Sequence, residues 1–194
     1  MQQGIQCIIG LGNPGEKYRD NRHNVGFWFI DELARRHGIS LHPEGKFFGD
    51  VGRFDLPAGK CWLLKPMTFM NRSGKSASAL ARFYRIPPEH ILVVHDELDL
   101  PAGTVRLKQG GGHGGHNGLR DIISALGSRD FWRLRLGIDH PGHRDKVTGY
   151  VLSRPSRDDQ QKIELAIDAS ADSIEDLLRG DYQQFMNELH SRAK

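Results

Sequence analysis

The chain has few cysteines and no long apolar segment, and both shortages limit what it can be. Two of its 194 residues are cysteine, Cys7 and Cys61, and each lies in an apolar, strand-like run. This usage predicts buried free thiols instead of a disulfide or a cysteine-based metal site. No apolar run approaches the roughly 20 residues that cross a bilayer, and residues 1–4 lack the basic and apolar parts of a secretory signal. We therefore expect a cytoplasmic protein with no membrane contact.

Charge of one sign is not in large excess either. Lysine and arginine number 27 against 24 aspartate and glutamate, which gives a net charge of +3 and a pI of about 8.9. This balance allows an anionic partner without requiring one, so a case for nucleic acid depends on where the basic residues lie. The length, the absence of repeats and linkers, and the 23 glycines are typical of one globular domain spanning residues 1–194.

The apolar patterns predict an α/β fold of three layers, in which a twisted, mixed and mostly parallel sheet lies between helices on both faces. Residues 46–54 and 60–64 resemble the two strands of a hairpin, which makes the sheet mixed. The alternation in residues 132–138 predicts a strand that exposes Arg133 and Arg135 together. The other expected strands are 5–9, 91–94, 104–108 and 147–152, and the expected helices are 24–37, one ending near 84, 119–126 and most of the chain after 156.

A candidate catalytic base lies in residues 10–26, a long polar crossing between the first strand and the first helix. Such crossings lie at the carboxyl edge of a sheet, where α/β folds bind ligands. His23 offers a titratable base there. Asp96 ends an aliphatic strand, and it reaches the same edge if that strand is the parallel neighbour of the first. A carboxylate there would fix the imidazole tautomer, although loop histidines and strand-ending acids commonly have no such role.

Two nucleotide-binding motifs are matched only in part. The spacing of Gly10, Gly12 and Gly15 fits the dinucleotide fingerprint, but Pro14 interrupts it and polar residues continue where a helix should begin. Residues 74–76 resemble the end of a phosphate-binding P-loop, but phenylalanine stands at position 69, where that motif needs glycine. Neither segment predicts a nucleotide cofactor.

Amides and a glycine-rich loop add further candidates. Asn71 stands just before a predicted helix, where it can cap the helix or direct its amide into the cleft of His23. Six of the nine residues in 110–118 are glycine, so this loop can move or let a ligand approach backbone N–H groups.

The loop histidines have a spacing that suits a metal. They are His113, His116, His140 and His143, and no cysteine or carboxylate framework accompanies them in the sequence. We therefore expect ordinary loop histidines, no metal and no other cofactor.

Five motifs resemble, in order and spacing, the bacterial peptidyl-tRNA hydrolase family, and the resemblance covers nearly the whole chain. Residues 44–60 and the helices after Pro155 are the divergent parts. Asn21 stands where this family commonly has threonine, and Asp139 lies in a turn that often has glycine. The motifs are Gly10-Leu11-Gly12-Asn13-Pro14-Gly15, Arg22-His23-Asn24, Thr68-Phe69-Met70-Asn71-x-Ser73-Gly74, His95-Asp96-Glu97-Leu98-Asp99 and Gly110-Gly111-Gly112-His113-Gly114-Gly115-His116-Asn117-Gly118.

The resemblance implies an enzyme that cleaves the ester between a peptide and the 3′ end of tRNA, and so recycles tRNA from chains that leave the ribosome early. It implies that His23 activates water, that Asp96 orients His23, and that Asn71 donates to the water or the developing oxyanion. The remaining residues that it implies for substrate and tRNA binding are Asn13, Tyr18, Met70, His116, Asn117, Lys108 and Arg135.

The same resemblance implies the partners. Lys108 and Arg135 match the pair that grips the 5′ phosphate of tRNA, so the acceptor stem, the 3′ end and the nascent peptide are the expected contacts. An association with complexes released from ribosomes is a further expectation. An ester has a good leaving group, so one base and neutral donors can suffice without a metal. We expect a monomer, because the RNA-binding face must stay free.

Two other hypotheses stay open. The first is an RNA-binding protein on the same fold that has lost hydrolysis, as in some plant organelle relatives of the family. The second is another α/β hydrolase of small esters or amides. The sequence lacks a Gly-x-Ser-x-Gly nucleophile elbow, and neither cysteine lies near the motif of His23.

Overall fold

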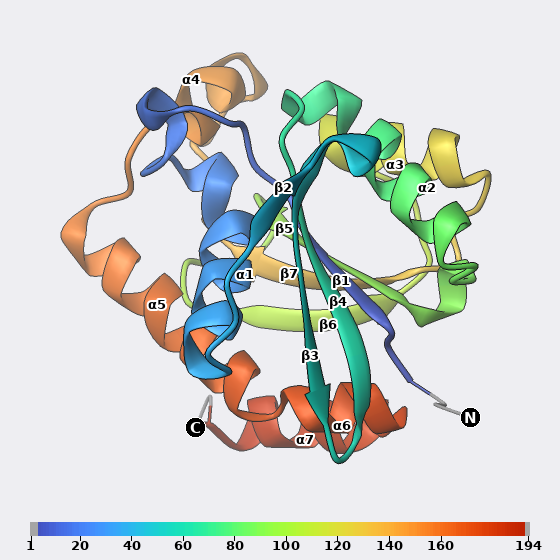
Figure 1. Ribbon diagram of the computed structural model, residues 1–194. Helices are drawn as coiled ribbons and strands as arrows, with labels where there is room; N and C mark the ends of the chain where they lie inside the picture. Colours follow the sequence, from blue (N-terminus) through green and yellow to red (C-terminus); the bar gives the residue numbers. More distant parts are fainter. Residues whose placement is uncertain (1–3, 193–194) are drawn as a thin grey trace.

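A seven-stranded sheet in the order β2-β3-β4-β1-β5-β7-β6 forms the middle layer (Figure 1). The computed structural model describes residues 4–192. The four central strands run parallel, and β3 and β6 run antiparallel to their neighbours. The mixed, mostly parallel sheet is thus confirmed. The strands are β1 (Cys7–Gly10), β2 (His42–Glu44), β3 (Gly49–Leu56), β4 (Gly59–Pro66), β5 (Ile91–Glu97), β6 (Val105–Gln109) and β7 (Trp132–Gly137).

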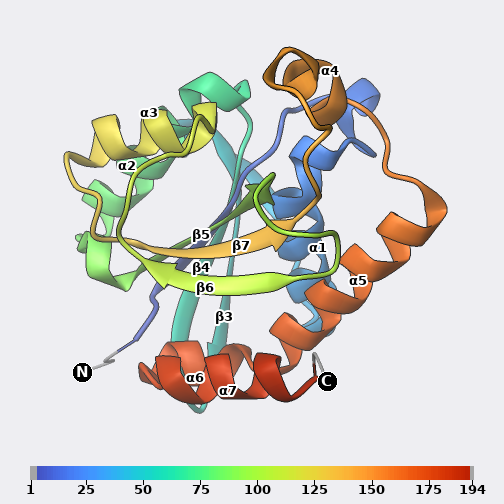
Figure 2. The ribbon, with the colours of Figure 1, turned by 180° about the vertical axis from the view of Figure 1, so that it is seen from behind.

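Helices cover both faces of this sheet, as predicted (Figure 2). Helices α1 (Val25–Arg36), α5 (Arg157–Asp172), α6 (Ile174–Arg179) and α7 (Tyr182–Arg192) pack into one core, and α2 (Ser73–Phe83) and α3 (Asn117–Leu126) pack into the other. Short 3-10 helices η2 (Arg22–Asn24), η3 (Gly45–Phe47) and η4 (Met70–Arg72) precede α1, β3 and α2. None of the helices within residues 4–192 has the length and hydropathy needed to span a membrane.

The two cores exist because successive side chains on a strand point to opposite faces. Ile8 and Leu92 belong to the core under α1 and α5, whereas Ile9 and Val93 belong to the core under α2 and α3. Both strands are buried throughout, which is why their sequences are continuous apolar runs. Both cysteine thiols are free and buried, as expected.

The strand expected at 147–152 is wrong, because this segment is the short helix α4 (Val147–Val151). Its β-branched residues favour a strand locally, but tertiary contacts prevail. The guanidinium of Arg22 lies 3.8 Å from the ring centroid of Tyr150, and it donates to the Tyr150 carbonyl and the Ser153 hydroxyl at 3.1 and 2.6 Å. Strand β2 was not expected at all, and the first predicted hairpin strand begins at Gly49, since the residues before it form η3.

Helix α1 approaches the sheet at a glycine. A β-carbon built on Gly26 lies 2.5 Å from the Leu11 nitrogen and 2.5 Å from the Val94 carbonyl oxygen, which are backbone atoms that cannot rotate away. Residue 10 is also glycine, and a β-carbon there meets the Gly26 carbonyl oxygen at 2.2 Å. This close approach sets the position of η2, which lies directly before α1 and carries His23.

We expect Gly26→Ala to lower the free energy of unfolding by about 1–3 kcal/mol, because the added methyl group forces the helix off the strands. Urea denaturation measures the change. Gly149→Ala is the control, since that glycine lies in α4 with open space around it. A helical alanine there should raise stability by about 0.5–1 kcal/mol. Equal effects of the two substitutions would contradict the close-packing argument.

Candidate active site

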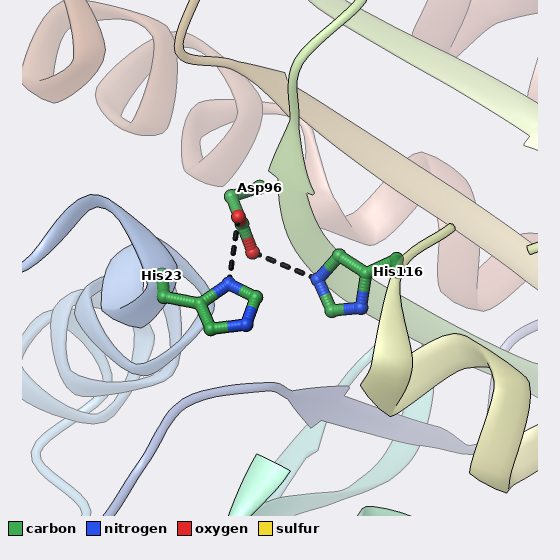
Figure 3. A group of neighbouring side chains, drawn as sticks. All are labelled: His23, Asp96 and His116. Carbon is green, nitrogen blue, oxygen red and sulfur yellow. Dashed lines mark hydrogen bonds and ion pairs between the residues drawn. The ribbon is translucent and has the colours of Figure 1, made fainter. Parts of the chain in front are cut away.

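Asp96 lies between two histidines at the carboxyl end of β5 (Figure 3). Its Oδ2 is 2.8 Å from Nδ1 of His23, and its Oδ1 is 2.8 Å from Nε2 of His116. Strands β1 and β5 are parallel neighbours, so the loop after β1 reaches the end of β5. The contact expected between Asp96 and His23 is therefore confirmed, and His116 is a second partner that the sequence did not predict for Asp96.

The hydrogen bonds determine which of the two histidines at Asp96 can act as a base. An ionised carboxylate only accepts, so both histidines donate an N–H to Asp96. The other nitrogen of His116, Nδ1, accepts from the backbone N–H of Leu119 at 3.3 Å and caps α3. His116 therefore has both nitrogens occupied. His23 has its Nδ1 on Asp96, and its Nε2 carries a lone pair.

Burial and charge together set the protonation of this group. Burial alone would raise the pKa of Asp96, but the two histidines hold it well below its usual value. Burial alone would lower the pKa of His23, yet the charge of Asp96 and its hydrogen bond raise it above 6.5. His95, which is fully buried, has its pKa lowered to about 4 by burial and by the nearby His116, so it is neutral.

A cavity of about 310 Å³ opens beside these side chains. Polar groups from all five motifs line it together with residues in and directly after α4. They are Asn13, His23, Phe69, Met70, Asn71, His95, Asp96, Glu97, Leu98, His113, Gly114, Gly115, His116, Asn117, Val147, Thr148, Val151 and Leu152. The side chains of α4 were missed because that segment was predicted as a strand. Phe69 belongs to the third motif but was not predicted as a site residue, although it is 59% exposed at this cavity.

Three asparagines line the cavity, and they differ in their hydrogen bonds and in their positions relative to the helices. The Oδ1 of Asn13 accepts from the backbone N–H of Met70 at 2.7 Å, so its amide nitrogen is left as a donor. Asn71 lies in η4, and because the cap residue of η4 is Phe69 and that of α2 is Arg72, Asn71 is the cap of neither. Asn117 is the first residue of α3, and the cap of that helix is the neighbouring His116.

Tyr18 and Met70 lie at different depths. Met70 is buried in the wall of the cavity. Tyr18 is not among the lining residues, but its ring packs edge to face on the ring of Phe69, with the two ring centroids 6.4 Å apart. Tyr18 thus belongs to the surroundings of Phe69 at this end of the sheet.

The expected basic pair lies outside the cavity. Lys108 on β6 is exposed, and Arg135 on β7 is half-buried with its Nε donating to Glu97 at 2.9 Å. The expectation that Arg133 is exposed beside Arg135 is wrong. Arg133 is 2% exposed, because the glycine-rich loop folds over it and accepts hydrogen bonds from its guanidinium at the carbonyls of Gly111 and Gly112.

One group within the described residues could hold a metal ion. His23, Asp96 and His116 bring their possible ligand atoms within 4.8 Å of one another. The expectation that no carboxylate accompanies the loop histidines is therefore wrong for His116. In the geometry observed, the same atoms hydrogen-bond one another, so two N–H protons stand where a cation would bind.

The raised pKa of His23 gives a prediction for titration. Asp96→Asn removes the charge that raises this pKa and leaves the burial that lowers it, so the pKa of His23 should fall from above 6.5 to below 6.5. Histidine ring NMR resonances followed between pH 4 and about 9 measure the shift. The ring resonances of the exposed His140 serve as the internal reference in both proteins. An unchanged His23 titration would show that Asp96 does not set its protonation.

Comparison with known proteins agrees with the motifs. The family model described as peptidyl-tRNA hydrolase matches residues 7–194. The peptidyl-tRNA hydrolase of Alkalilimnicola ehrlichii is 56% identical over 192 residues, which cover 98% of each chain. That of Halorhodospira halophila is 58% identical over 187 residues and 96% of each chain.

A solved structure agrees as well. The crystal structure of peptidyl-tRNA hydrolase from Acinetobacter baumannii superposes with a TM-score of 0.92 at 48% identity, covering 95% of this chain and 94% of that one. Sequence identity and fold thus extend over nearly the full length of both proteins. The chain belongs to the peptidyl-tRNA hydrolase family.

Proposed function

We propose that this chain hydrolyses the ester between a peptide and the 3′-terminal ribose of tRNA, and so returns free tRNA to translation. The observation that carries the proposal is the Asp96–His23 pair, whose free Nε2 stands beside a cavity lined with amides. Family membership supports the same reaction. The substrate contacts are the peptide, the 3′ end and the acceptor stem, and the source of substrate is peptidyl-tRNA released from ribosomes.

In the proposed mechanism His23 is the general base. Its Nε2 takes a proton from water as the water oxygen attacks the ester carbonyl carbon. Asp96 stabilises the imidazolium that forms, because its negatively charged carboxylate already accepts a hydrogen bond from the N–H at Nδ1. The tetrahedral intermediate then expels the ribose oxygen, which takes the proton back from His23. The products are a peptide acid and a tRNA with a free terminal hydroxyl group.

The amides supply neutral donors for this reaction. The side-chain oxygen of Asn13 is used by the N–H of Met70, which leaves its amide nitrogen as a donor. We propose that this nitrogen binds the peptide carbonyl. Asn71 caps neither η4 nor α2, and it positions the attacking water or donates to the oxyanion. Asn117 and Met70 complete the peptide-binding wall, and Tyr18 supports Phe69 at its edge.

The cavity favours a blocked amino group over a free one. Its acidic side chains are Asp96, which is held by two histidines, and Glu97, which is held by Arg135. A free α-ammonium group therefore finds no unpaired carboxylate among the lining residues, whereas the amide of a peptide can bond to the asparagines. This contrast supports peptidyl-tRNA over aminoacyl-tRNA as the substrate.

We expect the protein to cleave N-acetyl-aminoacyl-tRNA and to leave unblocked aminoacyl-tRNA intact. His23→Ala should lower kcat at least about a thousandfold, because it removes the imidazole that Asp96 orients as the base. Release of labelled amino acid measures the rates, and a filter-binding assay shows whether tRNA binding persists. No cleavage by the wild type together with tight tRNA binding would favour a binding protein that has lost hydrolysis.

The RNA side is proposed to depend on Lys108 and Arg135, which bind the 5′ phosphate of tRNA. Each alanine substitution should raise KM for the full tRNA substrate by about tenfold, and by far less for a short N-blocked aminoacyl ester. Steady-state kinetics on both substrates measure the difference. Equal increases for both substrates would place these residues in the peptide site or the fold instead.

We further propose that the protein acts as a monomer in the cytoplasm. The basic face of β6 and β7 must stay open for RNA, and a dimer through that face would cover it. Light scattering of the purified protein, with and without tRNA, measures the oligomeric state.

A further inference from the structure

Glu97 makes a hydrogen bond with each oxygen of its carboxylate. Arg135 donates its Nε to Oε1 at 2.9 Å, and the backbone N–H of Asp99 donates to Oε2 at 3.3 Å. The Glu97 and Arg135 side chains are only 18% and 24% exposed. Although burial alone would raise the pKa of Glu97, the hydrogen bond from Arg135 lowers it, so the carboxylate is charged. A charged, backbone-anchored acceptor holds the guanidinium in one orientation.

This orientation leaves the outer edge of Arg135 available. In the part of the chain that the structure describes, its two terminal nitrogens make no hydrogen bond. Those nitrogens form the edge of a guanidinium that can bind phosphate with two parallel hydrogen bonds. Arg106 lies opposite Arg135 in the β6–β7 register, and Lys108 follows two residues later on the same face of β6.

Strand β5 connects this basic face with the catalytic cavity. Neighbouring residues on a strand point to opposite faces, so Asp96 reaches His23 while Glu97 reaches Arg135. One peptide bond therefore joins the residue that orients the base to the residue that holds the arginine. The distance between the two sites is set by the rigid backbone of a central, buried strand.

We infer that Glu97 is a positioning residue for the RNA substrate: it directs the terminal nitrogens of Arg135 toward the 5′ phosphate at a fixed distance from the ester. This inference rests on the proposed function and on the phosphate-binding role of Arg135. Binding of the phosphate therefore requires a Glu97 side chain long enough to hold Arg135, as well as the charge of Arg135.

A purely electrostatic role for Glu97 predicts the opposite result. A carboxylate that only neutralises Arg135 and Arg106 would compete with the phosphate, so its removal would strengthen RNA binding and lower KM. A carboxylate that orients Arg135 aids phosphate binding, so its removal raises KM. The sign of the change separates the two roles.

Three variants test the inference. Glu97→Gln keeps an oxygen acceptor on a side chain of the same length but without the charge. Glu97→Asp keeps the charge on a shorter side chain, and Glu97→Ala removes the acceptor and the charge. For each, kcat and KM are measured on N-acetyl-aminoacyl-tRNA carrying either a 5′ phosphate or a 5′ hydroxyl group. Thermal unfolding checks that each variant folds.

We expect Glu97→Ala and Glu97→Asp to raise KM for the phosphorylated substrate about tenfold, with kcat changed less than about threefold. In both variants the preference for the 5′ phosphate should largely disappear. Glu97→Gln should restore the wild-type KM to within about threefold. A loss of folding alone would lower the active fraction without removing the phosphate preference.

Several results would overturn the inference. One is an unchanged or lower KM in Glu97→Ala and Glu97→Asp, and another is a Glu97→Gln variant that behaves like Glu97→Ala. Rapid cleavage by the wild type with no preference for the 5′ phosphate would overturn the role of Glu97 and leave the proposed hydrolysis intact. Absence of cleavage of either substrate by the wild type would overturn the proposed function itself, and this inference with it.

Discussion

The carboxylate of Asp96 is the group on which the rest of the site depends. A buried charge costs free energy unless it is paired, and Asp96 is 4% exposed. The two histidines that pair with it come from separate segments, η2 before α1 and the turn that caps α3. The same interaction therefore joins the two sides of the cavity and fixes both imidazole tautomers. His116 uses its second nitrogen on α3, so of the two histidines bound to Asp96, His23 is the one whose Nε2 is left for a proton.

Close packing at glycines brings the segments that carry these histidines together. At Gly26 the helix that follows His23 touches the backbone of β5 and of the residue after β1. At Gly118, in α3, a β-carbon would lie 2.6 Å from the sulfur of Met70 and 2.9 Å from the side chain of Leu11. These contacts place η2, η4 and the start of α3 around one sheet end. Helix α4 forms the remaining wall of the cavity. Arg22 holds it there by donating to the carbonyls of Tyr150 and Ser153 and to the Ser153 hydroxyl.

The parts of this arrangement that follow from local patterns could be predicted from the sequence. Uninterrupted apolar runs identify β1 and β5 as central strands, and their adjacency is enough to place Asp96 near His23. The fold of α4 could not be predicted, because it depends on Arg22, which is 128 residues away from the carbonyl of Tyr150. The bond from His116 to Asp96 was missed for a similar reason. A loop with six glycines in nine residues gives no local pattern from which to predict its path.

Arg133 and Arg135 show where periodicity stops being informative. Both lie on the same face of β7, as the alternation predicts, yet one is buried and the other is half-exposed. The pattern identifies a face, but burial depends on what covers that face. Here the cover is the glycine-rich loop, whose carbonyls accept from Arg133 near its start, while His116 bonds Asp96 at its end. Between these anchors, residues 113–115 form a turn beside the cavity, in which the N–H of Gly115 donates to Nδ1 of His113 and the N–H of His116 donates to the His113 carbonyl. The glycines thus give the loop the turns that its path requires, because Gly110, Gly111, Gly114 and Gly115 all have a positive φ that side chains with a β-carbon rarely adopt.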